Sequence, residues 1–195
     1  MNPNIGDIKK LFVNRSDVYA VQLPEGGYRS IKEPLTDELI QQHLKGKITI
    51  GVYQINQQNQ AKWICWDFDI GENNLEDEFH KAKRLFLHLK DEYKLNPVLE
   101  FSGKKGFHVW LFCKLTDAYS VQQWAMKISD GYDYSELFPK QTELKEDLPL
   151  GSLVKMPLGK HQESGHWSHF FDPGDLENRL TIQEDSLKLL GDNDD

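Results

Sequence analysis

Apolar and polar side chains alternate along residues 62–70, KWICWDFDI, in the way that is typical of a β-strand. Successive side chains on a strand point to opposite faces, so one face carries Ile64, Trp66 and Phe68. The other face carries Cys65, Asp67 and Asp69. Two neighbouring carboxylates repel each other unless a positive charge lies between them, and the usual remedies are a divalent cation or a cluster of Arg and Lys.

The same kind of pattern predicts further strands and helices along the chain. Strands are expected at residues 18–23, 47–55, 62–70, 96–102, 107–115, 152–158 and 166–172. Helices are expected at residues 4–13, 35–46, 75–94 and 117–128, with another helix beginning at Leu176. Caps support two of them, namely Thr36 for the second helix and Thr116 or Asp117 for the fourth.

Turn residues indicate how these elements connect. NQQNQ, residues 56–60, lies between two β-branched or aromatic runs, so residues 47–70 are expected to form a β-hairpin. Residues 130–150 are polar and are expected to be irregular. Strands with helices laid on one side indicate an α+β fold.

Composition narrows the class of protein. The 195 residues suit one domain or two small lobes that share a core, and 38% of them are hydrophobic. The sequence shows no apolar run long enough to span a membrane and no signal-peptide pattern, so we expect a cytoplasmic location. Cys65 and Cys113 lie in apolar strand patterns and are expected to be buried thiols, too few for a Cys₄ zinc site.

The distribution of charge matters more than its sum. The net charge of −8 argues weakly against binding to nucleic acid. Acidic residues, however, cluster in three stretches, whereas residues 151–171 contain two lysines, three histidines and one glutamate. The chain is therefore acidic on average, with one locally basic and His-rich segment.

Two motifs in the sequence suggest chemistry with phosphates. Asp67 and Asp69 could hold one or two Mg²⁺ or Mn²⁺ ions, although two surface charges would give the same pattern. In SGKKGFHVW, residues 102–110, two glycines flank two lysines between strands, and such a loop can approach an anion closely. The spacing differs from that of a Walker loop, and an ordinary hairpin with a basic tip is the alternative.

The C-terminal third offers additional candidates. Lys155, Lys160 and His161 could contact phosphates or a template. Asp172 ends a predicted strand and could supply a third carboxylate, or it could be a turn residue before Pro173. The histidines of this segment are spaced outside the common zinc patterns.

Taken together and in this order, the motifs resemble those of the archaeo-eukaryotic primase superfamily. WDFD matches the family's first motif, hDhD, SGKKGFHVW matches its second, S-G-x-x-G-x-H, and FFD matches its third, a hydrophobic residue followed by an acid. RSDVYA, HLKGKITIGVY and LVKMPLGKHQESGHWSHFFDP resemble segments of bacterial and mobile-element primase-polymerases, including CRISPR-associated members. The likeness covers roughly residues 11–173.

The resemblance implies a fold and a set of roles. The fold would be a primase catalytic core, an RRM-like sheet with helices plus a small N-terminal αβ lobe. Residues 1–195 would form one catalytic domain, with residues 176–195 as a C-terminal helix and acidic tail. Two Mg²⁺ or Mn²⁺ ions would be held by Asp67, Asp69 and Asp172. The triphosphate of an NTP or dNTP would be bound by Ser102, Lys104, Lys105, Gly106, His108 and Lys160.

The activity that the resemblance implies is that of a DNA primase or DNA polymerase. Such a nucleotidyltransferase makes or extends primers on single-stranded or primed DNA by two-metal-ion phosphoryl transfer. Many relatives carry a helical accessory domain for starting a strand, but here only about 20 residues follow the third motif. Either the chain is a catalytic core cut from a larger protein, or its priming depends on a partner. Three alternatives stay open: an end-joining-type repair polymerase, a metal nuclease, and a non-catalytic nucleotide- or nucleic-acid-binding module.

Two tyrosines are candidates for a contact with the sugar of the nucleotide. Tyr28 is expected in a loop, and Tyr53 could equally be a core aromatic of its strand.

Overall fold

The fold, in a computed structural model that describes residues 5–71 and 74–180, consists of two antiparallel sheets with four helices. The helices are α1 (Ile5–Phe12), α2 (Asp37–Leu44), α3 (Leu75–Asp91) and α4 (Ala118–Ile128). The smaller sheet has the order β2-β1-β3-β8, formed by β1 (Tyr19–Gln22), β2 (Tyr28–Ile31), β3 (Ile50–Tyr53) and β8 (Leu153–Lys155).

The larger sheet has six strands in the order β10-β9-β5-β6-β4-β7. They are β4 (Gln60–Asp69), β5 (Val98–Phe101), β6 (Gly106–Asp117), β7 (Glu136–Phe138), β9 (His169–Asp172) and β10 (Asp175–Leu180). Its central part runs β4-α3-β5-β6-α4-β7 in sequence, which is the βαββαβ arrangement of an RRM-like fold. The predicted α+β class and RRM-like sheet are therefore confirmed.

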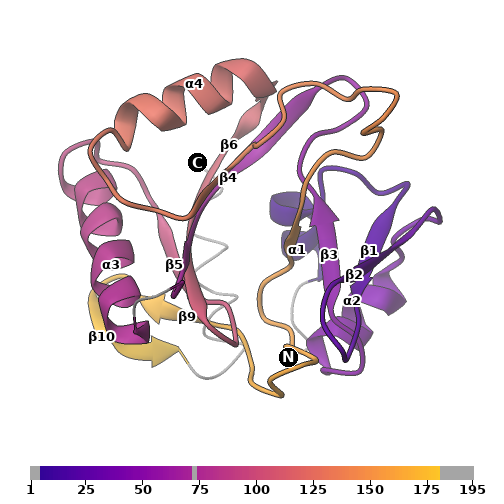
Figure 1. The fold of residues 1–195 in the computed structure, drawn as a ribbon, viewed down its shortest axis with the longest axis horizontal. Coiled ribbons are helices and arrows are strands. Elements are labelled where there is room, and N and C mark those ends of the chain that lie inside the picture. Colours follow the sequence, from indigo (N-terminus) through magenta and orange to yellow (C-terminus); the bar gives the residue numbers. More distant parts are fainter. Residues whose placement is uncertain (1–4, 72–73, 181–195) are drawn as a thin grey trace.

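One face of the large sheet is covered by α3 and α4 (Figure 1). Asn74 caps α3 by accepting a hydrogen bond of 2.9 Å from the backbone N–H of Asp77, and Asp117 caps α4 in the same way through Ser120. Apolar side chains from both helices pack on alternating residues of β4, including Trp66 and Phe68, which are fully buried. The apolar side chains of the two helices and of the strand therefore form one buried layer.

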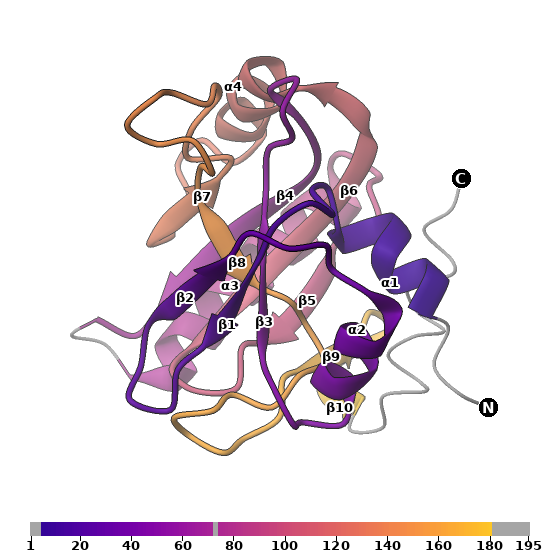
Figure 2. The same cartoon turned by 90° about the vertical axis from the view of Figure 1, so that its right-hand side faces the viewer.

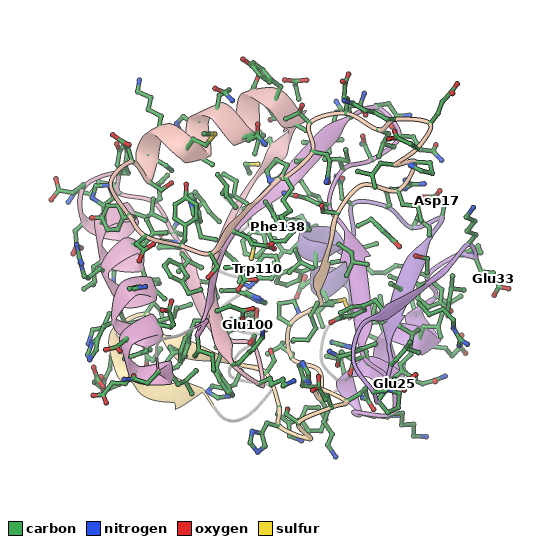
Figure 3. The ribbon with its side chains drawn as sticks, viewed as in Figure 1. Asp17, Glu25, Glu33, Glu100, Trp110 and Phe138 are labelled. Atoms are coloured by element: carbon green, nitrogen blue, oxygen red, sulfur yellow. The ribbon has the colours of Figure 1, made fainter. Side chains whose placement is uncertain are left out.

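The opposite face of the large sheet is turned toward the small lobe, which lies beside it (Figures 1 and 2). A second core joins the two lobes, and its centre is a cluster of aromatic rings. The ring of Trp110 lies 5.2 Å from that of Phe12 and 5.1 Å from that of Trp63. Trp63 also donates a hydrogen bond of 3.0 Å to the carbonyl of Phe12. Figure 3 shows Trp110, Phe138 and Glu100 between the lobes.

The predicted hairpin over residues 47–70 is wrong. Strand β3 pairs with β1 and β8 in the small sheet, whereas β4 pairs with β6 and β7 in the large one. The NQQNQ segment therefore leads from one lobe to the other. Both strands are apolar enough to be buried in the interior of a sheet, so their own patterns do not determine which strands they pair with.

Three further elements differ from the sequence-based expectation. Residues 136–138, expected to be irregular, form β7, a strand too short to produce a detectable alternation. Tyr28 begins β2 and does not lie in a loop. Residues 175–180 form β10, whereas a helix was expected from Leu176, and the rest of that predicted helix and acidic tail lies outside the described residues.

Two smaller observations complete the fold. Both cysteines are free thiols, and Cys65 is buried as expected while Cys113 is half-buried. Within residues 5–71 and 74–180, no helix has the length and apolar character needed to cross a membrane.

Candidate active site

A cleft of about 240 Å³ lies between the large sheet and the small lobe. It collects most of the charged residues that the sequence singles out. From the large sheet and its β5–β6 turn it is lined by Asp67, Asp69, Ser102, Lys104, Lys105, His108 and Glu136. From the opposite side it is lined by Gln22, Tyr28, Lys155 and His161. The cleft thus sets carboxylates beside a group of cationic side chains.

The register between β4 and β6 explains how the first two motifs meet. Asp67 lies opposite His108, and Asp69 lies opposite Gly106. The Nε2 atom of His108 is 3.6 Å from Oδ1 of Asp67, and Nζ of Lys105 is 3.2 Å from Oδ2 of Asp69. Residues that are about 40 positions apart in sequence are therefore neighbours on one sheet face.

The two glycines of the SGKKG turn are required for different structural reasons. Gly103 has φ +98°, a backbone conformation that side chains with a Cβ rarely adopt. A Cβ on Gly106 would lie 2.5 Å from the carbonyl oxygen of Phe68 and 2.6 Å from Oδ1 of Asp69. Gly106 therefore allows the basic turn to approach the carboxylate strand closely.

Asp67 is a buried carboxylate whose negative charge is only partly balanced by its neighbours. Its Oδ1 atom is buried and has no hydrogen-bond partner within the described part of the chain. Burial raises the pKa of Asp67; His108 opposes this, but the charges of Asp69, Glu136 and Glu100 add to it, and the pKa reaches about 6. A cation in the cleft would remove this electrostatic conflict.

Glu136 is a site residue that the sequence analysis did not identify. Strand β7 pairs with β4 so that Glu136 lies opposite Asp67, and its side chain lines the cleft. Ser135, the residue before β7, helps to fix this edge, since its backbone N–H donates to the Asp67 carbonyl at 2.8 Å and its hydroxyl accepts from the Asp69 N–H at 2.9 Å. One signal could have found Glu136: the fourth strand of an RRM-like unit pairs with the first, so an acid there lies beside the Asp67–Asp69 pair.

Asp172, the predicted third carboxylate, is not brought to the cleft. Strands β5 and β6 separate its strand, β9, from β4 in the sheet order. Asp172 accepts a hydrogen bond of 2.8 Å from the backbone N–H of Gly174, which is the turn role that the sequence left open. Because the sequence motif consists only of an acid after two aromatic residues, it does not indicate which strand the acid lies beside.

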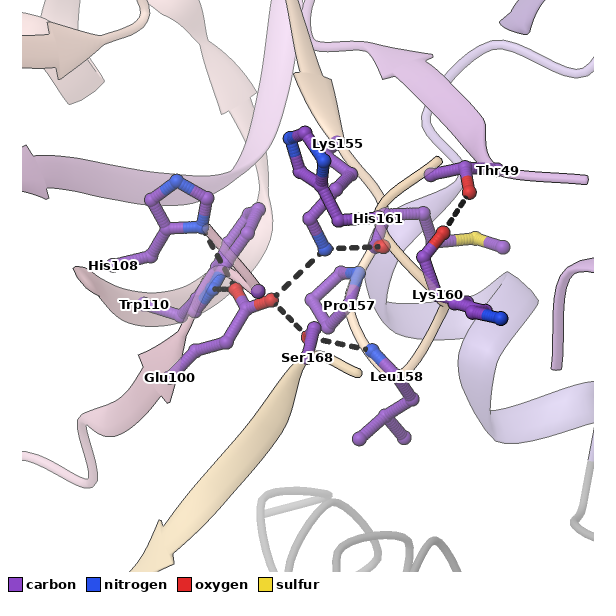
Figure 4. A network of polar contacts seen from close by, with 12 residues as sticks. Thr49, Glu100, His108, Trp110, Lys155, Pro157, Leu158, Lys160, His161 and Ser168 are labelled. Atoms are coloured by element: carbon purple, nitrogen blue, oxygen red, sulfur yellow. Dashed lines mark hydrogen bonds and ion pairs between the residues drawn. The ribbon is translucent and has the colours of Figure 1, made fainter. Parts of the chain in front are cut away.

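Lys160 also lies outside the lining of the cleft. Its backbone carbonyl accepts a hydrogen bond from the hydroxyl of Thr49, and its side chain points away from Glu100 (Figure 4). Lys155, which the sequence analysis treated as an equal candidate, does line the cleft.

A network of polar contacts underlies the cleft (Figure 4). At its centre is Glu100 of β5, whose side chain is fully buried. Its Oε2 atom accepts hydrogen bonds from Nδ1 of His108 at 2.8 Å and from Nε1 of Trp110 at 2.7 Å. Its Oε1 atom accepts from Nζ of Lys155 at 3.3 Å and from the hydroxyl of Ser168. Both oxygens of Glu100 are therefore fully used.

The charges in this network shift one another's pKa values. Burial alone would raise the pKa of Glu100, but the charges of Lys155 and His108 and the hydrogen bonds from His108 and Ser168 outweigh it and lower the pKa to about 2. Burial alone would lower the pKa of His108, but Glu100 and Asp67 outweigh it and raise the pKa. Glu100 is therefore an ionised carboxylate, which can only accept hydrogen bonds.

The loop after β8 carries His161 into the cleft and joins both lobes. Nε2 of His161 lies 3.0 Å from Nε2 of Gln22. Burial lowers the pKa of His161, and the charges of Lys155 and Lys104 lower it further. In the same loop the hydroxyl of Ser164 donates to the carbonyl of Gly103 at 2.6 Å, and Glu163 forms an ion pair with Lys104. The basic turn is thus tied to the loop opposite.

The two tyrosine candidates differ in their position relative to the cleft. Tyr28 lines the cleft. Tyr53 is buried, and its hydroxyl lies 2.6 Å from that of Ser30. Only Tyr28 is therefore in a position to contact a ligand in the cleft.

Metal binding is not preformed in the arrangement of these side chains. Across residues 5–71 and 74–180, no three His, Cys, Asp or Glu side chains are grouped closely enough to hold an ion as they stand. Asp69 is paired with Lys105, and Glu136 is paired with Lys140 at 2.5 Å. The buried Oδ1 of Asp67, which has no hydrogen-bond partner in the described part of the chain, nevertheless fits an oxygen-rich cation site.

Comparison with known proteins agrees with the fold and the motifs. The family model described as "TOTE conflict system, Archaeo-Eukaryotic Primase domain" matches residues 28–192. Since this match covers most of the chain, the protein belongs to the archaeo-eukaryotic primase domains of that family. No curated protein matches the sequence significantly.

The chain is also similar, at low identity, to several solved structures. The AEP domain of the cyanophage S-2L primase-polymerase has a TM-score of 0.49 and 16% identity, over 90% of this chain and 89% of that one. The primase RepB′ has a TM-score of 0.48 and 12% identity, over 96% of this chain and 61% of that one. The polymerase domain of Mycobacterium tuberculosis Ligase D, solved with DNA, has a TM-score of 0.44 and 12% identity, over 97% and 87%.

Proposed function

We propose that this chain is a metal-dependent, template-directed nucleotidyltransferase that makes or extends primers from NTPs or dNTPs. The observation that carries the proposal is the cleft, in which Asp67, Asp69 and Glu136 face Lys105 and His108. A site for phosphoryl transfer needs oxygen ligands for Mg²⁺ or Mn²⁺ together with cations for the triphosphate. Membership of the primase family supports the same activity.

The metal ligands in this proposal are Asp67, Asp69 and Glu136. Glu136 takes the place that the sequence gave to Asp172, because β7 and not β9 lies beside β4. Two bound Mg²⁺ or Mn²⁺ ions would activate the attacking hydroxyl and stabilise charge on the phosphates. Lys105 and Lys140, which now pair with Asp69 and Glu136, would be released when ions occupy the carboxylates.

The triphosphate would lie against the SGKKG turn. Ser102 can donate its hydroxyl, Lys104 and Lys105 supply charge, and Gly106 permits close approach. From the other wall, Lys155 and His161 face the same space. These cations would neutralise the negative charge that develops on the phosphates during transfer.

The partners in this proposal are a single-stranded or primed DNA template and a nucleoside triphosphate. Residues 1–195 would act as one catalytic domain, since the core between the lobes contains residues of both sheets, such as Val52 and Trp110.

The test is a gel assay with a single-stranded template, Mn²⁺ or Mg²⁺ and labelled nucleotides, run with and without a primer. Wild type is compared with Asp67→Ala/Asp69→Ala, and circular dichroism verifies that both are folded. We expect incorporation by the wild type and none by the variant. Products without a primer would identify a primase, and products only with a primer would identify a polymerase core. Absence of any product from folded wild type would contradict the proposal.

A further inference from the structure

Glu100 is fully buried, and although His108 and Lys155 line the cleft, Glu100 does not. It therefore cannot touch a nucleotide, but it contacts two residues that can. Each of its two oxygens binds one of these residues: Oε2 accepts a hydrogen bond from His108, and Oε1 accepts one from Lys155. Strand β5 of the large sheet is thereby linked to β8 of the small one.

The contact with His108 fixes the protonation of one ring nitrogen. An ionised carboxylate can only accept, so Nδ1 of His108 must carry the proton in their 2.8 Å hydrogen bond. The other nitrogen, Nε2, then faces Asp67 at 3.6 Å, on the cleft side. In Figure 4 the ring of His108 has one nitrogen directed at Glu100 and the other directed away from it.

We propose that Glu100 is a positioning residue of the nucleotide site, which holds His108 with Nδ1 protonated and Nε2 presented to the cleft, and which holds the Lys155 ammonium at the opposite wall. This inference rests on the proposed function for its effect on turnover. It does not rest on that function for the state of His108, which is a property of the unliganded chain. Partners that orient a functional histidine through its second nitrogen typically change activity about 10–100-fold when they are removed.

The protein contains its own reference for a histidine tautomer. His43 is also fully buried, but its Nδ1 accepts from the Ile50 N–H at 3.0 Å and its Nε2 lies 2.9 Å from the Pro157 carbonyl. Since a carbonyl only accepts, Nε2 of His43 must carry the proton. His43 and His108 should therefore differ at Nδ1 in one ¹⁵N–¹H correlation spectrum, because this nitrogen lacks a proton in His43 and carries one in His108.

The variants must separate the hydrogen bond from the buried charge. Removing Glu100 alone would leave Lys155 uncompensated and could unfold the chain, so Lys155→Met is the common background. In Glu100→Gln/Lys155→Met an amide oxygen remains to accept from Nδ1 of His108. In Glu100→Met/Lys155→Met the side chain keeps its length but offers no acceptor. Both double variants are neutral at these two positions.

In the wild type, we expect Nδ1 of His108 to be protonated. The Gln/Met variant should keep this state, with kcat/KM for nucleotide incorporation within about 3-fold of Lys155→Met, whereas the Met/Met variant should lose the fixed Nδ1 proton and at least about 10-fold in kcat/KM. The signals of His43 should stay unchanged in all of them, which verifies the fold. An unprotonated Nδ1 of His108 in the wild type would overturn the inference, as would equal behaviour of the two double variants. If the wild type incorporates no nucleotide, the proposed function fails, but the spectra still decide whether Glu100 fixes His108.

Discussion

The two faces of the six-stranded sheet differ in the side chains that they bury, although both faces come from the same strands. The face under α3 and α4 holds an apolar layer that includes Trp66 and Phe68. The face toward the small lobe combines an aromatic cluster around Trp110 with charged groups, among them Asp67 and Glu100. Burying charge is costly unless it is paired, so the burial of these charges does not by itself stabilise the fold.

The polar face itself contains two contrasting carboxylates. Glu100 accepts four hydrogen bonds or ion pairs, and its pKa is lowered to about 2. Asp67 has one buried oxygen without a hydrogen-bond partner among the described residues, and burial raises its pKa to about 6. The hydrogen-bond partners of Glu100 thus lie within the protein, whereas in the proposed function a cation would complete Asp67. In that proposal, Glu100 organises the site and Asp67 acts in it.

The largest expected effect concerns Asp67. We expect Asp67→Asn to reduce nucleotide incorporation by at least about 1,000-fold, because loss of a metal carboxylate removes several kcal/mol of transition-state stabilisation. Primer-extension rates at saturating nucleotide measure this. Activity within about 10-fold of wild type would remove Asp67 from the chemistry.

A change on the apolar face should affect the fold and not the site. Phe86 of α3 is almost fully buried in the apolar layer, so Phe86→Ala should reduce the free energy of unfolding by about 3–5 kcal/mol. Urea denaturation measures the loss. The affinity of the variant for nucleotide should stay near that of wild type under conditions where it is folded, and a large loss of affinity would show that the two faces are coupled.

The third carboxylate allows a matched pair of variants. Glu136→Gln should reduce incorporation by about 100-fold, because Glu136 faces the cleft beside Asp67, whereas Asp172→Asn should change it by less than about 3-fold. Steady-state kinetics on both proteins checks this. The reverse order of effects would restore Asp172 as the metal ligand.

The raised pKa of Asp67 predicts a dependence of stability on pH. A carboxyl whose pKa is higher in the folded state, here about 6 against its ordinary value of 3.8, favours folding when it is protonated and loses that contribution as the pH rises through 6. Wild type should therefore lose stability relative to Asp67→Asn between about pH 4 and pH 7, by on the order of 3 kcal/mol. Parallel denaturant titrations of both proteins measure the difference, and parallel pH profiles would contradict the assignment.

The sequence was informative where structure is local. The alternation in WDFD correctly separated the apolar face from the acidic face, and Asp117, one of two predicted caps, caps α4. The GKKG turn was predicted with its basic tip and with the positive φ of Gly103. The cap and the turn depend on interactions within about ten residues, whereas the contacts of Gly106 with the carboxylate strand do not.

The sequence was not informative about features of the fold and the site that depend on which strands pair. The 47–70 hairpin failed because β3 and β4 are both apolar strands that join different sheets. Glu136 was missed because β7 has three residues, and Asp172 was chosen because an acid after two aromatics does not reveal its neighbours. The partners of Glu100, from β6, β8 and residue 168, likewise come together only in the folded chain.

The most direct test of the central claim is a titration of the chain with Mn²⁺, followed by electron paramagnetic resonance, with and without a nucleoside triphosphate. Wild type should bind the ion, Asp67→Asn and Glu136→Gln should bind it more weakly, and Asp172→Asn should bind it like wild type. No binding by wild type in either condition, or loss of binding only in Asp172→Asn, would contradict the view that a metal ion completes Asp67.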